Sequence, residues 1–174
     1  IVFKCIGKTY ENSVRLAKII KNKDKNKIII FCGILVGSET DVECFINSQY
    51  DIPADFIICG EDEIALPNLI TLIEKNEIKK ADIIFNKIGK VINCIHGPYV
   101  EDINILPFFD FSNFNLEFYR FPQKIELFMS KGCPWRCTFC IDWLTEKKYR
   151  CMSGKRIYEE MVYQSKLYPQ INHF

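Results

Sequence analysis

The stretch NSVRLAKIIKNKDKNKIIIFCG, residues 12–33, decides the fold class. Apolar residues recur at helical spacing within residues 12–21, which predicts an amphipathic helix with basic residues at its end. After a charged turn, residues 27–32 form a continuous apolar run that ends at Gly33. Such a run is typical of a strand buried on both faces of a parallel sheet.

The alternation of helix and strand continues along the chain. Residues 41–47 predict a weaker helix, residues 54–59 (ADFIIC) a second buried strand, and residues 64–76 a second helix. Repeated units of this kind predict an α/β fold with a doubly wound, Rossmann-like, mostly parallel sheet. In such a sheet, ligands bind beyond the carboxyl ends of the strands.

Glycines follow the predicted strands at the edge where a ligand would bind: Gly33, Gly37 and Gly60. A glycine at a strand end lets the backbone approach a bulky cofactor, so these three are candidate cofactor-binding residues. Ordinary turns between strand and helix are the alternative explanation. The acidic residues 61–63 open the second helix, where carboxylates complement the helix dipole.

The remaining chain predicts two further parts. Residues 81–84 and 91–95 predict a short hairpin that completes an α/β domain at residues 1–100. Residues 101–123 form a connector rich in proline and phenylalanine, and residues 124–174 begin a second module. The second module is expected to open with a strand, followed by a cysteine-containing loop and an amphipathic helix.

The strand is predicted at residues 124–129 and the helix at residues 155–167, with Ile157, Met161 and Gln164 on one face. The chain starts inside an apolar run without methionine, and the second module breaks off after one strand–loop–helix unit. We therefore expect a fragment of a longer protein, with both domains truncated.

Composition excludes several classes of protein. With 48% apolar and 26% charged residues, the chain is not intrinsically disordered. The 23 basic and 22 acidic residues leave a net charge of +1, so bulk charge predicts no nucleic-acid or membrane partner. No apolar run reaches the ~20 residues that span a bilayer, and no secretory signal is present. A cytoplasmic protein is expected.

The nine cysteines fall into two groups. Without a secretory signal they are expected to be reduced rather than paired in disulfides. Five of them stand singly among apolar neighbours and are predicted to be small buried side chains: Cys5, Cys32, Cys44, Cys59 and Cys94. The others include a cluster within the segment SKGCPWRCTFC, residues 130–140.

In that segment Cys133, Cys137 and Cys140 have the spacing C-x3-C-x2-C. Three thiolates can bind three irons of a 4Fe-4S cluster and leave the fourth iron open to an exogenous ligand. A zinc site remains an alternative, although neither Cys151 nor His173 completes a familiar zinc-finger spacing. A redox-active pair at the C-x2-C end of the motif is a second alternative. Cys151 stays unassigned.

The cysteine spacing after a predicted strand resembles the signature of radical S-adenosylmethionine (SAM) enzymes. The resemblance implies a partial (β/α) barrel in which Cys133, Cys137 and Cys140 hold a 4Fe-4S cluster. The open iron would bind SAM, and reduction would cleave it to a 5′-deoxyadenosyl radical. Phe139 would pack near the adenine, or alternatively anchor the loop in the core. Lys131 and Arg150 flank the loop and are expected to be solvated charges; the alternative is that they steer anionic SAM or an electron donor.

The chain is similar in particular to the cobalamin-binding-domain class of these enzymes. Residues 55–63 (DFIICGEDE) resemble its strand and acidic turn, residues 106–111 (LPFFDF) its connector, and residues 148–150 (KYR) the stretch after its cysteines. The resemblance implies a cobalamin-binding-like first domain. The cobalamin-ligating Asp-x-His-x-x-Gly pattern is absent, which leaves open both cobalamin and a methyl transfer that depends on it.

The resemblance also implies partners: a small-molecule or other unknown substrate, and a low-potential electron donor such as flavodoxin or ferredoxin. The full-length protein is expected to be an enzyme, whereas this fragment alone is not expected to turn over. Two rival functions remain. One is a non-catalytic cobalamin- or nucleotide-binding module with an incomplete barrel. The other is a methylthiotransferase-type enzyme, whose extra cluster could use Cys5, Cys32 and Cys59.

Overall fold

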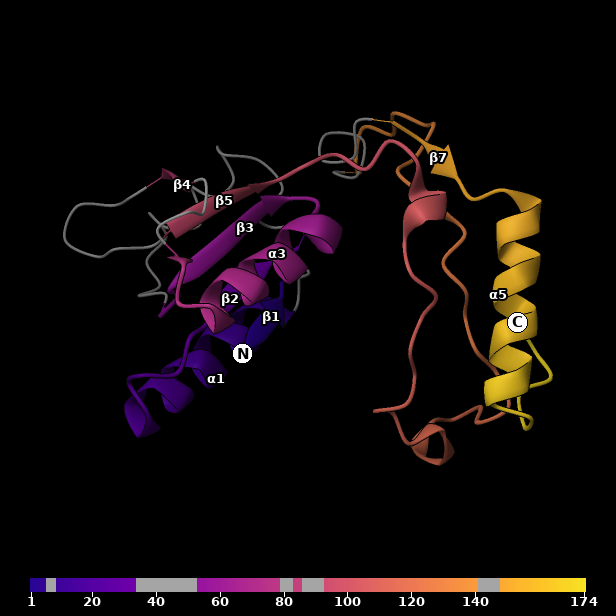
Figure 1. Cartoon of the computed structure of the whole chain (residues 1–174), viewed down its shortest axis with the longest axis horizontal. Coiled ribbons are helices and arrows are strands. Elements are labelled where there is room, and N and C mark those ends of the chain that lie inside the picture. The colour runs from indigo at the N-terminus through magenta and orange to yellow at the C-terminus, as the bar shows by residue number, and fades with distance from the viewer. Residues whose placement is uncertain (6–8, 34–52, 79–82, 86–92, 141–147) are drawn as a thin grey trace. The chain divides into compact units, whose positions relative to one another are not determined.

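The structure, a computed structural model, divides into two compact units, Ile1–Val100 and Glu101–Phe174 (Figure 1). The described residues are 1–5, 9–33, 53–78, 83–85, 93–140 and 148–174. Within those ranges, no helix has both the length and the apolar character needed to cross a membrane. The predicted helix at residues 41–47 lies outside the described residues.

The first unit is built on a five-stranded sheet with the strand order β1-β2-β3-β5-β4. Its strands are β1 (Val2–Lys4), β2 (Ile30–Cys32), β3 (Phe56–Gly60), β4 (Ile83–Phe85) and β5 (Asn93–Gly97). Four of them run parallel, and β4 pairs antiparallel with β5. The prediction of an α/β fold with a mostly parallel sheet is confirmed, as is the antiparallel pair at its edge. Strand β1 was not predicted.

Helices α1 (Tyr10–Lys23) and α3 (Asp62–Glu74) pack on opposite faces of this sheet. Side chains alternate along β2, so Phe31 joins the core cluster on the α1 side, while Ile30 and Cys32 join the one on the α3 side. Both faces of the central strands are therefore buried, which explains why the sequence shows continuous apolar runs there. This arrangement is consistent with the Rossmann-like fold predicted.

The second unit has little regular structure. Two 3-10 turns, η4 (Ile103–Ile105) and η5 (Leu116–Phe118), interrupt an otherwise irregular segment. A two-residue antiparallel ladder joins β6 (Ser130–Lys131) to β7 (Arg150–Cys151), and helix α5 (Gly154–Leu167) follows directly. The predicted helix at residues 155–167 is thus confirmed as α5.

The strand predicted at residues 124–129 is wrong. Lys124 forms an isolated bridge with His173, and Met129 accepts a hydrogen bond from the Met152 backbone, but no ladder connects these two points. An apolar stretch becomes a strand only where a neighbouring backbone satisfies its N–H and C=O groups along its length. The described residues of the second unit supply no such neighbour, and the predicted start of a barrel is not confirmed.

Candidate functional site

The cysteine motif lies in the second unit, directly after β6. Cys133 and Cys140 are partly buried, Cys137 is exposed, and none of the three forms a disulfide. The Cys140 backbone N–H donates a 3.1 Å hydrogen bond to the Cys137 carbonyl, so the end of the motif forms a tight turn. The three thiols are therefore on one loop that solvent can reach, unlike the described cysteines of the first unit.

Gly132, which leads into the motif, is required by the local backbone. Its φ is +79°, a conformation that side chains other than glycine's rarely adopt. A Cβ atom at this position would also collide with the carbonyl oxygen of Lys148. The chain before Cys133 thus passes closely against the segment that enters β7. This contact fixes the direction in which the loop leaves the ladder.

The donor set of Cys133, Cys137 and Cys140 fits a 4Fe-4S cluster with three protein ligands, because all three are thiols outside any disulfide and partly or fully exposed. Within the described part of the chain, no three His, Cys, Asp or Glu side chains gather closely enough to hold a metal ion. A 4Fe-4S cluster binds its thiolates at three different irons, so they need not gather around one point as the ligands of a single ion do.

The aromatic residues of the loop face solvent. Phe139 is 90% exposed and Trp135 is 71% exposed. The alternative in which Phe139 anchors the loop in the core is therefore wrong. Phe139 is free to contact a ligand bound at the loop, and this contact remains a prediction.

Cys151, which the sequence left unassigned, lies on β7 directly opposite Ser130 of β6. Its side chain is within hydrogen-bonding reach of Tyr149, and this contact raises the pKa of the Tyr149 hydroxyl, whereas a hydrogen bond with Ser130 acts in the opposite direction. Arg150, expected to be a solvated charge, is buried. It points to the other face of the ladder from Tyr149 and Cys151, because side chains alternate along a strand.

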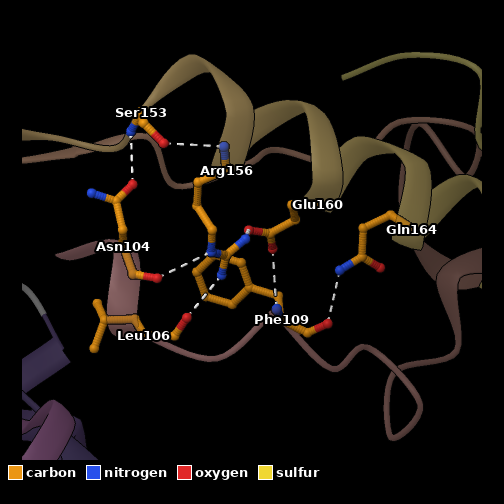
Figure 2. A network of polar contacts seen from close by, with 7 residues as sticks. All are labelled: Asn104, Leu106, Phe109, Ser153, Arg156, Glu160 and Gln164. Atoms are coloured by element: carbon orange, nitrogen blue, oxygen red, sulfur yellow. Dashed lines mark hydrogen bonds and ion pairs between the residues drawn. The ribbon is translucent and has the colours of Figure 1, made fainter.

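A polar network that the sequence did not reveal occupies the buried face of α5 (Figure 2). The predicted apolar face is wrong in this respect: Ile157 and Met161 are only partly buried, and the fully covered positions are Arg156, Glu160 and Gln164. The spacing of these three at i, i+4 and i+8 was visible in the sequence. Their polar character hid the fact that this is the packed face.

The Arg156 guanidinium lies at the centre of this network. Its Nη1 atom is 3.0 Å from Oε2 of Glu160, while Nε and Nη2 donate to the carbonyl oxygens of Asn104 (3.3 Å) and Leu106 (2.8 Å). It also lies over the Phe108 ring, with Cζ 3.9 Å from the ring centroid. Both charges of this buried ion pair thus have hydrogen-bond partners, which is the condition for burying them.

Of the candidate cofactor glycines, the structure describes Gly33 and Gly60, and both adopt a positive φ at the end of a strand. Gly33 has a φ of +110°, and an added Cβ would lie 2.7 Å from the carbonyl oxygen of Cys5. Gly60 has a φ of +88°. The close backbone approach at Gly33 is made by the protein itself, which favours the alternative of an ordinary turn. Gly37 lies outside the described residues, so its role is untested.

The acidic residues after β3 have distinct contacts. Asp62 and Glu63 lie in the first turn of α3, where the helix-dipole explanation places them. Glu61 has a different role, because its carboxylate accepts a 2.8 Å hydrogen bond from the backbone N–H of Val100. It therefore ties the start of α3 to the segment after β5. Asp62 also lies 3.4 Å from Lys4.

The described cysteines of the first unit are buried, as the sequence predicted: Cys5, Cys32, Cys59 and Cys94. Burial raises the pKa of the Cys5 thiol to about 11. Burial, followed by contact with Asp62, also raises the pKa of Cys32. Cys5 and Cys59 pack on the α1 side of the sheet, whereas Cys32 packs on the α3 side. This separation gives no support to an additional cluster on Cys5, Cys32 and Cys59. Cys44 lies outside the described residues.

Sequence comparison finds distant relatives that are enzymes. The chain is 24% identical to an anaerobic magnesium-protoporphyrin IX monomethyl ester cyclase of Synechocystis over 155 residues, which cover 86% of the chain and 30% of the relative. It is 25% identical over 153 residues to an uncharacterized methyltransferase of Pyrococcus horikoshii, covering 84% of the chain and 32% of the relative. A cyclase of Rubrivivax gelatinosus is 28% identical over 118 residues, which cover 62% of the chain and 21% of the relative.

The chain thus spans about a third of the length of the first two of these relatives. No protein-family model matches the sequence, and no solved structure matches it significantly. Similarity at this level connects the chain with enzymes of two named activities, cyclisation and methyl transfer.

Proposed function

We propose that this chain is the cofactor-binding part of a radical SAM enzyme. The observation that carries the proposal is the loop after β6, where Cys133, Cys137 and Cys140 have the spacing C-x3-C-x2-C, are partly or fully exposed and form no disulfide. The similarity to a cyclase and a methyltransferase supports an enzymatic role for the longer protein.

In this proposal the three thiolates hold three irons of a 4Fe-4S cluster. When bound, such a cluster supplies an electron that cleaves SAM to methionine and a 5′-deoxyadenosyl radical. The exposed Phe139 ring offers a flat apolar surface next to Cys140, suited to covering an adenine. Lys131 is only partly buried and carries a positive charge two residues before Cys133, which favours the approach of an anionic ligand or an acidic electron donor.

The activity of the whole protein is part of the same proposal. Its substrate would be a small molecule or another unidentified acceptor of the radical, and a low-potential protein such as flavodoxin or ferredoxin would supply the electron. The named activities of the relatives make carbon-centred cyclisation or methyl transfer the reaction types to examine first.

Anaerobic reconstitution of the chain with iron and sulfide tests the proposal. The expected result is ~4 irons per chain and a reduced-state EPR signal that changes when SAM is added. Cys137→Ala should abolish the signal. Cys151→Ala is the matched control, because Cys151 is equally exposed and near in sequence but outside the motif. Stoichiometric zinc without iron, or no metal at all, would contradict the proposal and favour a non-catalytic binding module.

The iron count also separates the methylthiotransferase alternative. A second cluster would raise the result to ~8 irons per chain. The burial of Cys5, Cys32 and Cys59 on two different faces of the sheet predicts that this will not happen. Cys32→Ala should therefore leave the iron content unchanged.

A cobalamin cofactor is a separate part of the proposal. It is supported by the resemblance of the first domain and by the methyltransferase among the relatives. The described glycines at the sheet edge do not add support, because the turn at Gly33 is filled by the chain's own backbone. The test is to titrate the chain with hydroxocobalamin and to measure visible absorption of the protein fraction after gel filtration. Cobalamin absorption in that fraction would support this part of the proposal, and its absence would contradict it.

A further inference from the structure

We propose that the polar side chains on the buried face of α5 bind the backbone of one segment and thereby position β6, the strand that leads into the cysteine loop. We call this set of side chains the latch. The latch consists of Arg156, Glu160 and Gln164, and it holds residues 104–109 (Figure 2). Four of its hydrogen bonds end on main-chain atoms, so it recognises the path of the segment rather than its side chains. The proposal does not depend on a cluster being bound.

Phe109 is the residue held most completely. Its N–H donates to Oε1 of Glu160 at 3.1 Å, and its carbonyl oxygen accepts from Nε2 of Gln164 at 2.8 Å. Both main-chain groups of one residue are therefore bound by side chains one helical turn apart. A shift of the segment by a single residue would break both contacts. In an extended chain the N–H and C=O groups of one residue point to one side, and those of the next residue point to the opposite side.

The position of Phe109 is passed on to the cysteine loop through its ring. The ring meets Phe128 edge-on, with the centroids 6.3 Å apart. Phe128 lies two residues before β6, and Cys133 follows β6 after Gly132. Through this ring contact, the latch fixes the position of the chain just before β6.

A second connection reaches the other strand of the ladder. Ser153 follows β7 after Met152, and its backbone N–H donates to Oδ1 of Asn104 at 2.8 Å. Its hydroxyl oxygen in turn accepts from the N–H of Arg156 at 3.2 Å and so caps α5. Asn104 therefore contacts the latch through its carbonyl and the end of β7 through its side chain. Both strands that support the loop are fixed to the same segment.

The chemistry of the latch points to positioning rather than stability. A buried ion pair recovers little more than its own desolvation cost, and an apolar replacement of equal shape is often no less stable. Gln164 is fully buried, yet its Oε1 atom has no hydrogen-bond partner among the described residues, which is itself unfavourable. These side chains instead contribute hydrogen bonds that can form with only one position of the backbone of residues 104–109.

Gln164→Met in the full chain separates the two roles. It keeps the length of the side chain, removes the unpartnered oxygen and removes the donor to Phe109. We expect a thermal midpoint close to that of the wild type, because the variant removes one unpartnered oxygen but also takes the donor from the Phe109 carbonyl, together with exchange of the Phe109 amide that is about tenfold faster. Maleimide labelling of the partly buried Cys133, followed by peptide mass spectrometry, should be about threefold faster.

The double variant Arg156→Met/Glu160→Leu provides a second test. Compared with Glu160→Leu alone, which leaves the Arg156 charge buried without its partner, it should regain most of the thermal midpoint but keep the faster exchange and labelling. Glu159→Gln is the matched control, because this neighbouring carboxylate forms only an exposed contact of 3.8 Å with Lys155. Wild-type exchange and labelling in both Gln164→Met and the double variant would overturn the proposal and leave the network a purely stabilising role.

Discussion

The two units satisfy their backbone hydrogen bonds in different ways. In the first unit, parallel ladders between β1, β2, β3 and β5 pair the main chain with itself, and apolar side chains fill both faces. In the second unit, the segment of residues 104–109 is bound instead by side chains of α5. Ladders impose a periodicity on the sequence, whereas side-chain contacts with an irregular backbone do not. The difference explains why the first unit was easier to predict.

The aromatic residues show the same contrast. Phe31 of β2 is completely buried and contacts Phe3 with stacked rings 5.3 Å apart. Phe118 of η5 and Phe139 of the cysteine loop are 87% and 90% exposed. A high aromatic content therefore signals a core in one unit and an accessible apolar surface in the other. Substitutions at matched positions test how far this contrast holds.

The largest effect is expected for Phe31→Ala. Removing a buried aromatic ring leaves a cavity between β2 and α1, and we expect a loss of about 3–5 kcal/mol in the free energy of unfolding. Phe118→Ala is the matched control and should change it by less than about 0.5 kcal/mol. Denaturant titration measures both, followed through exchange of the β3 amides for Phe31→Ala and of the α5 amides for Phe118→Ala. Equal losses for the two variants would show that the exposed rings are covered in solution.

A smaller effect is expected for Gly132→Ala. The positive φ and the collision with Lys148 should cost about 1–3 kcal/mol and loosen the ladder between β6 and β7. Gly154→Ala makes the same chemical change at the start of α5, where an added Cβ meets nothing within 4 Å. It should be neutral or stabilising by up to about 1 kcal/mol. Thermal unfolding with amide exchange at β7 distinguishes the two, and indistinguishable variants would refute the close approach.

The smallest effect concerns the pH dependence of the first unit. Because burial raises the pKa of Cys5 from 9.0 to about 11, the folded state keeps the proton over a range in which the unfolded chain has lost it. The stabilising contribution is therefore complete below pH 9 and is lost as the pH rises toward 11. Cys5→Ala should show a shallower decline of the thermal midpoint over this range. An equally steep decline in the variant would assign the effect to other groups.

Much of the site followed from spacing along the chain, but its surroundings did not. Of the eight described cysteines, the four in the first unit are buried, as their apolar neighbours predicted. The position of Cys151 opposite Ser130 could not be predicted, because it depends on the register of a two-residue ladder. At residues 124–129 the sequence predicted more than the structure contains. Their pattern favours a strand, but the described residues include no neighbouring strand that pairs with them along their length.

The sequence by itself determined the parallel α/β sheet, the helices α1, α3 and α5, and the loop that carries three closely spaced thiols. These features are encoded by local periodicity and by the positions of residues near one another in the chain. Only the tertiary structure decided that Arg156, Glu160 and Gln164 form the buried face of α5, and that Glu61 binds the backbone after β5. The physical reason is that a polar side chain is buried only where a distant backbone supplies its hydrogen-bond partners, and no pattern within α5 shows where that backbone will pass.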